Sequence, residues 1–383
     1  MSRIRVMNVI TGLGLGGAET ALTQLVQGLD RDRIEASVVS LQPESVLAQP
    51  IRTAGIPLHT LEMTGPSHLP VAVMRLRGLI REMRPHVVQT WLYHADLLGS
   101  LALLGMNQPP ALAWNLRCSA MAMEHYSLAS QLVRWSCCLL SSRPALVIAN
   151  SQAGLDAHTA LGYRPRRTEL IPNGFDLDRF RPAPEARAAL RREWGIADHT
   201  TIIGLVARWD PQKDHATFVR AAALLAAQRQ DVAFVLAGVG LEENAPGIGD
   251  LLTRFPVAAP VRLLGARSDI PYVLAGLDIG GLCSAFGEGF PNAVGEAMAC
   301  GLPCVVTAVG DSARLVGETG RVVPPRDAEA LAAAWSELVS LGSERRAQLG
   351  ETARNRIVNH YGLATMIARY ESCWTGLIQG DQP

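Results

Sequence analysis

Lysine is almost absent from this sequence. Of the 35 basic residues, 34 are arginine, and Lys213 is the only lysine. A GC-rich coding bias would explain the general preference for arginine. It leaves open a second interpretation, in which Lys213 occupies a site that needs a compact ammonium group and not a planar guanidinium.

An excess of charge of either sign is also absent. The 383 residues carry 35 basic and 35 acidic side chains, so the formal net charge is zero, and nothing favours binding to nucleic acid. The seven cysteines form no CxxC pair, which favours reduced thiols in a cytoplasmic protein over disulfides or a zinc site. There is no run of eighteen apolar residues and no signal-peptide pattern, so we expect no membrane-spanning segment.

Short apolar runs of strand length alternate with helical patterns along the chain. This alternation is typical of doubly wound parallel sheets in the α/β class. The first half predicts strands at 5–11, 36–41, 56–61, 86–91, 111–116, 145–150 and 168–173. After a turn-rich linker at 173–186, the pattern restarts with strands at 201–208, 232–238, 261–265, 277–283, 303–308 and 320–325. We therefore expect two Rossmann-like domains, 1–180 and 181–360, and a C-terminal helix in 361–383 that returns to the first domain.

A glycine-rich loop, GLGLGG at 12–17, follows the first predicted strand and precedes a helix. The spacing matches the dinucleotide fingerprint, which makes an NAD-dependent oxidoreductase one alternative. That fingerprint also needs an acidic residue at the end of the second strand. Ser40 and Gln42 stand there instead, and Glu35 lies at the wrong end. The remaining interpretation is a loop whose backbone approaches some ligand at Gly16 and Gly17.

Aromatic and polar residues close two strands of the first half. Trp91, Tyr93 and His94 follow one strand, and Arg117 follows the next. A lone histidine is usually structural, but ligands of open α/β sheets bind at the carboxyl ends of the strands. These residues are therefore candidates for a binding site.

The stretch from Cys283 to Cys304 holds two carboxylates, Glu288 and Glu296, separated by seven residues. Because Pro291 fits the first turn of a helix, we expect a helix to begin there. Its free N–H groups would then form an anion site between the carboxylates. Arg208 and Lys213 follow the first strand of the same half, where two cations would neutralise a diphosphate. The sequence shows no cluster of metal ligands, so we expect neither metal nor cofactor.

Four segments in this order resemble the retaining glycosyltransferases of family 4, across nearly the whole chain. They are GLGLGGAE (12–19), IPNGFDLDRF (171–180), VARWDPQKD (206–214) and EGFPNAVGE (288–296). The resemblance implies the GT-B fold, in which two Rossmann-like domains face each other across a cleft. It also implies a hexosyltransferase-type enzyme that uses a nucleoside-diphosphate sugar, which we expect to be UDP-linked. Trp209 departs from the family's commoner loop, which has a hydrophobic residue at that position, and this changes the wall of the donor cleft.

The resemblance also implies roles for individual residues. Arg208 and Lys213 would hold the diphosphate, Glu296 the ribose and Glu288 the sugar, with His94 beside the sugar on the acceptor side. Glu288, His94, Arg208 and Lys213 are the candidate catalytic residues. The expected donor-binding set is Gly16, Gly17, Arg208, Lys213, Arg267, Glu288, Gly289, Phe290, Pro291, Asn292 and Glu296. The expected acceptor-side set is Trp91, Tyr93 and Arg117.

Three further questions stay open at this point. A UDP-sugar 2-epimerase on the same fold is an alternative activity, although no second pair of carboxylates is evident in the first half. The acceptor would be a glycan, a glycolipid or a small molecule, as in polysaccharide assembly.

In 125–143, Leu128, Leu132, Trp135 and Leu139 share one helical face. This pattern favours core packing, with peripheral docking at the inner face of a membrane as the alternative.

Overall fold

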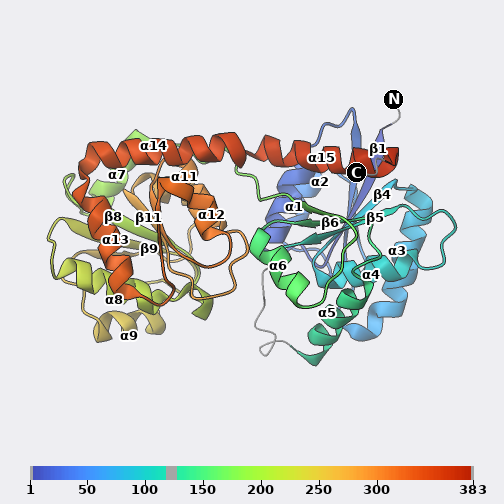
Figure 1. Cartoon of the computed structure of the whole chain (residues 1–383), viewed down its shortest axis with the longest axis horizontal. Coiled ribbons are helices and arrows are strands. Elements are labelled where there is room, and N and C mark those ends of the chain that lie inside the picture. Colours follow the sequence, from blue (N-terminus) through green and yellow to red (C-terminus); the bar gives the residue numbers. More distant parts are fainter. Residues whose placement is uncertain (1–2, 118–126, 381–383) are drawn as a thin grey trace. The chain divides into compact units, whose positions relative to one another are not determined.

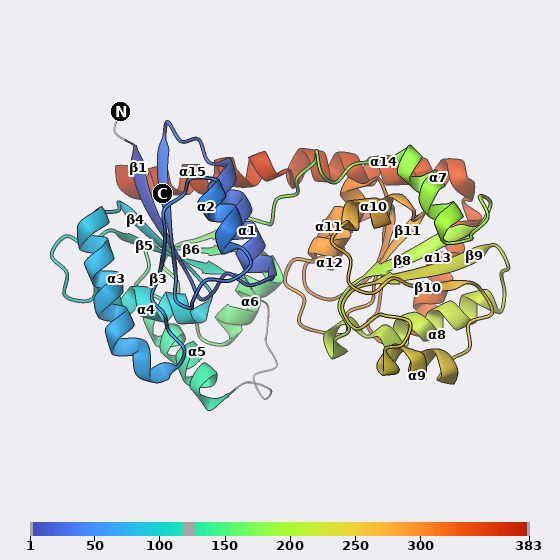
Figure 2. The same ribbon diagram turned by 180° about the vertical axis from the view of Figure 1, so that it is seen from behind.

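The computed structural model describes residues 3–117 and 127–380. It divides the chain into two compact units (Figures 1 and 2), one extending to Gly174 and resuming at Leu363, the other running from Phe175 to Gly362. The sequence placed the corresponding boundaries after residues 180 and 360. Each unit is described here by itself.

The first unit is built on a seven-stranded parallel sheet with the strand order β3-β2-β1-β4-β5-β6-β7. Its strands are β1 (Ile4–Ile10), β2 (Ile34–Ser40), β3 (Leu58–Thr60), β4 (Val87–Trp91), β5 (Ala111–Leu116), β6 (Leu146–Ala149) and β7 (Thr168–Leu170). Its helices are α1 (Gly17–Gly28), α2 (Ala48–Thr53), α3 (Leu69–Met83), α4 (Tyr93–Leu103), α5 (Leu128–Leu140), α6 (Gln152–Ala160) and α15 (Leu363–Gln379), with a 3₁₀ turn, η1 (Pro66–His68).

Helices cover both faces of this sheet. Helices α1, α2 and α15 enclose one apolar cluster, and α3, α4 and α5 enclose the other (Figure 1). The C-terminal helix α15 is fastened to the sheet by polar contacts as well. Asn115 Nδ2 donates to the Tyr370 hydroxyl at 2.7 Å, and the Trp374 indole donates to Gln89 Oε1 at 3.1 Å. Two buried amide side chains of the sheet thereby find partners in the last helix, as buried polar groups must.

The second unit contains a six-stranded parallel sheet with the order β10-β9-β8-β11-β12-β13. Its strands are β8 (Thr201–Val206), β9 (Val232–Ala237), β10 (Val261–Leu263), β11 (Ile279–Leu282), β12 (Cys304–Thr307) and β13 (Arg321–Val323). Its helices are α7 (Pro184–Glu193), α8 (His215–Ala226), α9 (Pro246–Arg254), α10 (Ile270–Ala275), α11 (Asn292–Ala299), α12 (Ser312–Val316), α13 (Ala328–Ser340) and α14 (Gly342–His360), with 3₁₀ turns η3 (Pro211–Lys213) and η4 (Gly317–Thr319).

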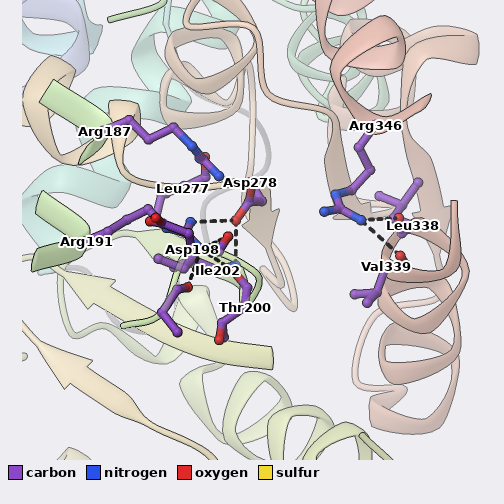
Figure 3. A network of polar contacts seen from close by, with 11 residues as sticks. Arg187, Arg191, Asp198, Thr200, Ile202, Leu277, Asp278, Leu338, Val339 and Arg346 are labelled. Carbon is purple, nitrogen blue, oxygen red and sulfur yellow. Dashed lines mark hydrogen bonds and ion pairs between the residues drawn. The ribbon is translucent and has the colours of Figure 1, made fainter. Parts of the chain in front are cut away.

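The helices of this unit also form two layers. Helices α8, α9 and α13 cover one face of the sheet, and α7, α10, α11, α12 and α14 cover the other (Figures 1 and 2). Before β11, Asp278 accepts from Arg187 at 2.6 Å and from Arg191 at 3.2 Å (Figure 3). Arg346 donates to the carbonyls of Leu338 and Val339 near the end of α13. These arginines therefore fasten helices at the edge of the sheet where its strands begin.

The predicted α/β class with two doubly wound parallel sheets is confirmed. Helix α5, however, contradicts the expectation of core packing for its apolar stripe. Leu128, Leu132, Trp135 and Leu139 are 83%, 61%, 58% and 62% exposed. Helical periodicity places four residues on one face, but it does not show whether another element covers that face. His125 and Tyr126, at the start of the predicted stretch, lie outside the described residues.

Candidate active site

Two neighbouring strands define the candidate site of the second unit. From β8 the chain continues to β9 and β10 on one side of the sheet, and later places β11, β12 and β13 on the other. The sheet therefore has its topological switch point between β8 and β11, where ligands of open α/β sheets bind beyond the carboxyl ends. The loop after β8 carries Arg208 and Lys213, and the loop after β11 carries Glu288.

Two aspartates fix the turn that presents Lys213. Asp210 caps η3 by accepting from the Gln212 N–H at 2.9 Å. Asp214 adopts a left-handed conformation, with φ 46°, and caps α8 by accepting from the Thr217 N–H at 3.2 Å and from its hydroxyl at 2.7 Å. Because side-chain caps satisfy the free N–H groups of a helix start, the two turns hold a defined geometry. Lys213 lies between them.

Lys213 forms an ion pair with Glu288 that the sequence did not predict. The ammonium contacts Glu288 Oε1, and the two side chains are only 17% and 7% exposed. The Ser284 hydroxyl donates to the same carboxylate oxygen at 2.5 Å, and the Thr307 hydroxyl donates to the Ser284 carbonyl at 2.7 Å. Lys213 after β8 and Ser284 after β11 thus converge on one carboxylate, and Thr307 at the end of β12 holds the Ser284 backbone. No sequence spacing pointed to Ser284 or Thr307.

Arg208 and Arg267 each have an acidic neighbour two residues further along. Arg208 Nε and Nη2 lie 3.0 and 2.9 Å from Asp210 Oδ2, and the arginine side chain is 62% exposed. Arg267 donates to both oxygens of Asp269, at 2.7 and 2.6 Å. These hydrogen bonds lower the pKa of the Asp269 carboxyl and raise the pKa of Arg267. Both guanidinium groups are therefore oriented, and Arg208 remains open to a ligand.

Helix α11 begins one residue after the expected position. Pro291 is its N-cap residue, and no side chain caps the first turn. Glu296 lies in the second turn, where burial raises the pKa of its carboxyl to about 7, although the charge of Arg179 lowers it in part. Within the described part of the chain, the Glu296 carboxyl has no hydrogen-bond or ion-pair partner. The two glutamates of the motif are therefore in different states: Glu288 is paired, and Glu296 is not.

The aromatic ring of Phe290 belongs to the core. It packs against Phe175, with centroids 6.0 Å apart, and against Tyr361 at 5.6 Å. A Cβ on Gly295 would overlap the ring of Phe175, so glycine is required where the segment after Gly174 crosses α11. Of Phe290, only the backbone is therefore a candidate for ligand contact.

Gly310, in the loop after β12, supports the loop that carries Glu288. Its φ is +59°, and a Cβ there would come within 2.7 Å of the Glu288 carbonyl carbon. The next residue, Asp311, donates its N–H to the Gly289 carbonyl at 2.9 Å. The loop after β12 therefore braces the Glu288–Gly289 backbone. This contact joins residues far apart in sequence, so the motif alone could not reveal it.

Trp209 occupies the same loop as Arg208. It is 39% exposed and lies over His215, with ring centroids 4.9 Å apart. Burial lowers the pKa of His215 to about 4, so this imidazole is neutral at pH 7. Gly240 and Gly247 lie against the Trp209 side chain: a Cβ on Gly240 would come within 2.6 Å of the Trp209 Cβ, and a Cβ on Gly247 within 2.6 Å of the indole. The large side chain at this departure from the family pattern is thus accommodated by small residues opposite it.

The first unit has its own switch point, between β1 and β4. Gly16 is the N-cap residue of α1 and Gly17 its first residue, and no side chain caps that helix. A Cβ on Gly16 would come within 2.9 Å of the Glu19 carboxyl carbon. The Glu19 side chain therefore lies against Gly16 at the start of α1, and the role of Gly16 and Gly17 in ligand binding stays a prediction.

Trp91 requires a correction. Its side chain is fully buried, stacks on Tyr370 at 5.9 Å and donates its indole N–H to Asn8 Oδ1 at 3.2 Å. An acceptor cannot touch this ring. Arg117 lies over it, 5.0 Å from the centroid, and donates to Asn173 Oδ1 at 2.7 Å. Position at a strand end indicated a site, but the β4 register turns the Trp91 side chain into the core.

Tyr93 and His94 begin α4. The Tyr93 hydroxyl lies 2.7 Å from His158 Nε2, and His158 is buried. His94 is exposed and lines a pocket of about 910 Å³ in the first unit. Partial burial lowers the pKa of His94 below its ordinary value. Of the two residues, only His94 lines this pocket. Its imidazole is neutral at pH 7.

No group of three or more histidine, cysteine or acidic side chains that could hold a metal ion occurs among residues 3–117 and 127–380. The thiols of Cys137, Cys283, Cys300, Cys304 and Cys373 are buried and unlinked. Burial raises the pKa of the Cys373 thiol to about 11.

Family comparisons cover most of the chain. Residues 15–179 match the model described as Glycosyltransferase Family 4, and residues 200–340 match that of Glycosyl transferases group 1. EpsF of Bacillus subtilis, assigned as a glycosyltransferase, is 27% identical over 80% of this chain and 79% of its own length. A UDP-Gal:alpha-D-GlcNAc-diphosphoundecaprenol alpha-1,3-galactosyltransferase of Escherichia coli is 27% identical over 56% of this chain and 55% of its own. A GDP-mannose-dependent phosphatidylinositol monomannoside mannosyltransferase of Mycolicibacterium smegmatis is 30% identical over 56% of this chain and 58% of its own length.

Solved structures share the architecture. Anabaena HepE in complex with UDP has a TM-score of 0.83 and 23% identity, covering 97% of this chain and 100% of that one. Sucrose-phosphate synthase from Thermosynechococcus elongatus has a TM-score of 0.81 and 19% identity, covering 98% and 100%. The parallel sheets and these neighbours show the GT-B fold. The two family models and the relatives make the protein a glycosyltransferase, and within that class a family 4-like one.

Proposed function

We propose that this chain transfers a hexose from a nucleoside-diphosphate sugar, a UDP-sugar in the first instance, to an acceptor hydroxyl with retention of configuration. The observation that carries the proposal is the arrangement at the β8/β11 switch point. Lys213 and Arg208 supply two cations, the uncapped N-terminus of α11 supplies backbone donors, and Glu288 and Glu296 lie before and within that helix. Anions bind at such helix starts, and guanidinium and ammonium groups bind diphosphate oxygens.

The donor is assigned to these groups as follows. The diphosphate lies against Arg208 and Lys213 and the α11 N-terminus, where Gly289, Phe290, Pro291 and Asn292 form the backbone approach. Glu296 accepts hydrogen bonds from the ribose hydroxyls, and Glu288 contacts the sugar. Arg267 and the glycine loop at Gly16 and Gly17 complete the proposed donor-binding set.

In the reaction, the acceptor oxygen forms a bond to the anomeric carbon while the bond from that carbon to the phosphate oxygen breaks. The diphosphate leaves with the bonding electron pair, and its oxygen takes the proton of the acceptor hydroxyl on the same face. Lys213 and Arg208 stabilise the negative charge that develops on the leaving group. His94 is assigned to the acceptor side, where its lowered pKa keeps it an uncharged hydrogen-bonding group at pH 7.

UDP is favoured over GDP as the nucleotide because one relative is named for UDP-galactose and a neighbour binds UDP. GDP-mannose is the competing donor, since other relatives are named for it. Thermal unfolding with UDP-glucose, UDP-galactose and GDP-mannose tests the choice, and we expect stabilisation by the UDP-sugars. Proton NMR of the hydrolysed or transferred sugar then reports the anomeric configuration. If no nucleoside diphosphate and no nucleotide sugar stabilises the protein, the proposal is refuted.

No observation favours the alternatives raised by the sequence. After β2 the chain reads Leu41, Gln42 and Pro43, and the Ser40 hydroxyl donates to the Gln42 carbonyl at 2.8 Å, so the acidic partner of an NAD ribose is missing there. Incubation with donor alone separates a transferase from an epimerase, because only the epimerase returns an isomerised nucleotide sugar.

A further inference from the structure

The first unit contains a pocket of about 910 Å³ whose lining is mostly apolar. Its polar groups include Thr11, Gln42 and His94, which lie shortly after the ends of β1, β2 and β4 at the carboxyl edge of the sheet. These three strands are neighbours in the order β2-β1-β4. One end of the pocket therefore opens at the switch point of the first sheet, beside the histidine assigned to the acceptor.

Away from that edge the lining is mostly hydrocarbon, and Thr64 and Ser136 are the residues with hydroxyl groups among the described ones there. His94, Leu97 and Leu101 lie on one face of α4, and α5 contributes Leu132 and Leu139 among others. The segment 63–66 and Leu69 form the remaining lining, and α3 and α5 both pack against α4. The pocket thus extends along α4, between α5 and the start of α3.

Among the described residues, the lining contains no charged side chain. None of its eighteen described members is Asp, Glu, Lys or Arg, and the one histidine among them has a lowered pKa. Charged groups would lose hydration there without gaining a partner, so the occupant must be uncharged along most of its length. A volume of about 910 Å³ is at the upper end of the range of roughly 300–1,000 Å³ for small-molecule sites.

Helix α5 shows where the pocket opens to solvent. Leu132 and Leu139 line the pocket, yet they are 61% and 62% exposed, so they lie at its mouth. Leu128 and Trp135 on the same helix are as exposed, at 83% and 58%, but do not line it. Apolar surface of this kind usually marks a binding site.

We propose that this pocket binds the hydrocarbon chain of a lipid-linked acceptor, with the acceptor's polar head at Thr11, Gln42 and His94. The inference rests on the proposed glycosyl transfer and specifies its acceptor class. A bilayer would meet a convex apolar face flanked by basic residues, whereas this site is concave and uncharged and has a polar end. Those features fit a single amphipathic molecule that enters tail first.

Displacement of the fluorescent apolar probe N-phenylnaphthylamine by hexyl, octyl and decyl β-glucosides, each below its micelle concentration, tests the inference. We expect affinity to rise about fourfold for each added methylene, because each buries further apolar surface. Displacement that does not depend on chain length would overturn the inference.

Four variants on one helix provide the matched comparison. L132E and L139E place a carboxylate at the mouth of the pocket and should lower the affinity for the decyl glucoside by about tenfold or more. L128E and W135E are equally exposed changes outside the lining and should bind as the wild type does. Equal weakening by all four would instead indicate general surface adsorption and refute the pocket assignment. Circular dichroism checks that each variant is folded.

Thermal stabilisation by UDP-glucose, measured on the same preparations, separates the two proposals. We expect it to be retained in all four variants, because none of them lies in the second unit. If no nucleotide sugar stabilises even the wild type, the proposed transfer is wrong, while chain-dependent binding of the glucosides would still establish an apolar site. If donors bind and chain length has no effect, the acceptor class is wrong and the transfer stands.

Discussion

The unpaired carboxyl of Glu296 should make donor binding depend on pH. Burial raises its pKa to about 7, whereas the proposed contact to two ribose hydroxyls requires an acceptor, which the ionised form provides best. Below pH 7 the free protein must release a proton before it binds the donor well. Affinity should therefore rise with pH and level off above the pKa.

The size of the effect follows from the fraction of Glu296 that is ionised. With a pKa of about 7, that fraction falls from nearly all at pH 8.5 to about 3% at pH 5.5, so Kd should rise about 30-fold over this range. UDP-glucose is the suitable ligand, because its diphosphate diester does not titrate in the window. Isothermal titration calorimetry at half-unit steps of pH measures the curve, and proton release at pH 6.5 in buffers of different ionisation enthalpy provides a second reading.

E296Q is the decisive variant. It keeps the size of the side chain and one acceptor oxygen but cannot titrate, so it should bind UDP-glucose more weakly at pH 8.5 and with no slope. E351Q removes a carboxylate at an exposed position on α14 and should retain the wild-type dependence of Kd on pH. A flat wild-type curve, or an unchanged slope in E296Q, would show that Glu296 does not hold the ribose as an anion.

The same pKa also affects stability, with the opposite sign. Between its unfolded and folded pKa values, this carboxyl stays protonated in the folded protein while it is ionised in the unfolded chain. Its destabilising contribution therefore develops from about pH 4.5 and is complete above about pH 7. E296Q should therefore unfold at a higher temperature than the wild type at pH 8 and at nearly the same temperature at pH 4.5.

Three other substitutions test separate contacts. K213M should lower the free energy of unfolding by about 3 kcal/mol, because Glu288 is left buried without its cation; K213M/E288Q should regain most of this in urea unfolding and still fail to bind UDP-glucose. R208A removes an exposed charge, so we expect Kd to rise about tenfold or more with unfolding unchanged within about 0.5 kcal/mol; full affinity would remove Arg208 from the site. G295A should cost about 2 kcal/mol or more, because its methyl group would overlap the Phe175 ring, and the loss should be smaller when measured in an F175L background.

The fold was readable from the sequence because it depends on local periodicity. Apolar runs predicted the seven strands of the first unit and the six of the second, and Pro291 located the start of α11 to within one residue. The exposed stripe of α5 was misread for the same reason, since periodicity specifies a face and not its neighbours. Trp91 was misassigned because its position at a strand end does not reveal the direction of its side chain.

The contacts that shape the candidate site were not readable, because they join residues far apart in the chain. Lys213 and Glu288 are 75 positions apart, and Thr307 reaches the Ser284 carbonyl across 23. Gly310 and Gly295 are required only because of the backbone or ring packed against them. A single sequence gives no signal for such pairings, beyond the fact that the motif residues all follow strands of one parallel sheet.

The environments of the two glutamates explain why one motif can serve two purposes. Glu288 lies in a loop and is held by Lys213 and Ser284, so its charge is compensated before any ligand arrives. A donor diphosphate that attracts Lys213 would weaken this pair and leave the Glu288 carboxylate available to a cationic reacting centre. Glu296, inside α11, has no such partner among the described residues, and its raised pKa disfavours its charged form in the free protein. Because a buried charge is costly without a partner, the proposed function implies that each carboxylate gains its partner from a different end of the same donor. Loss of Lys213 should therefore impair turnover and stability together, whereas loss of Glu296 should impair affinity while raising stability at pH 8.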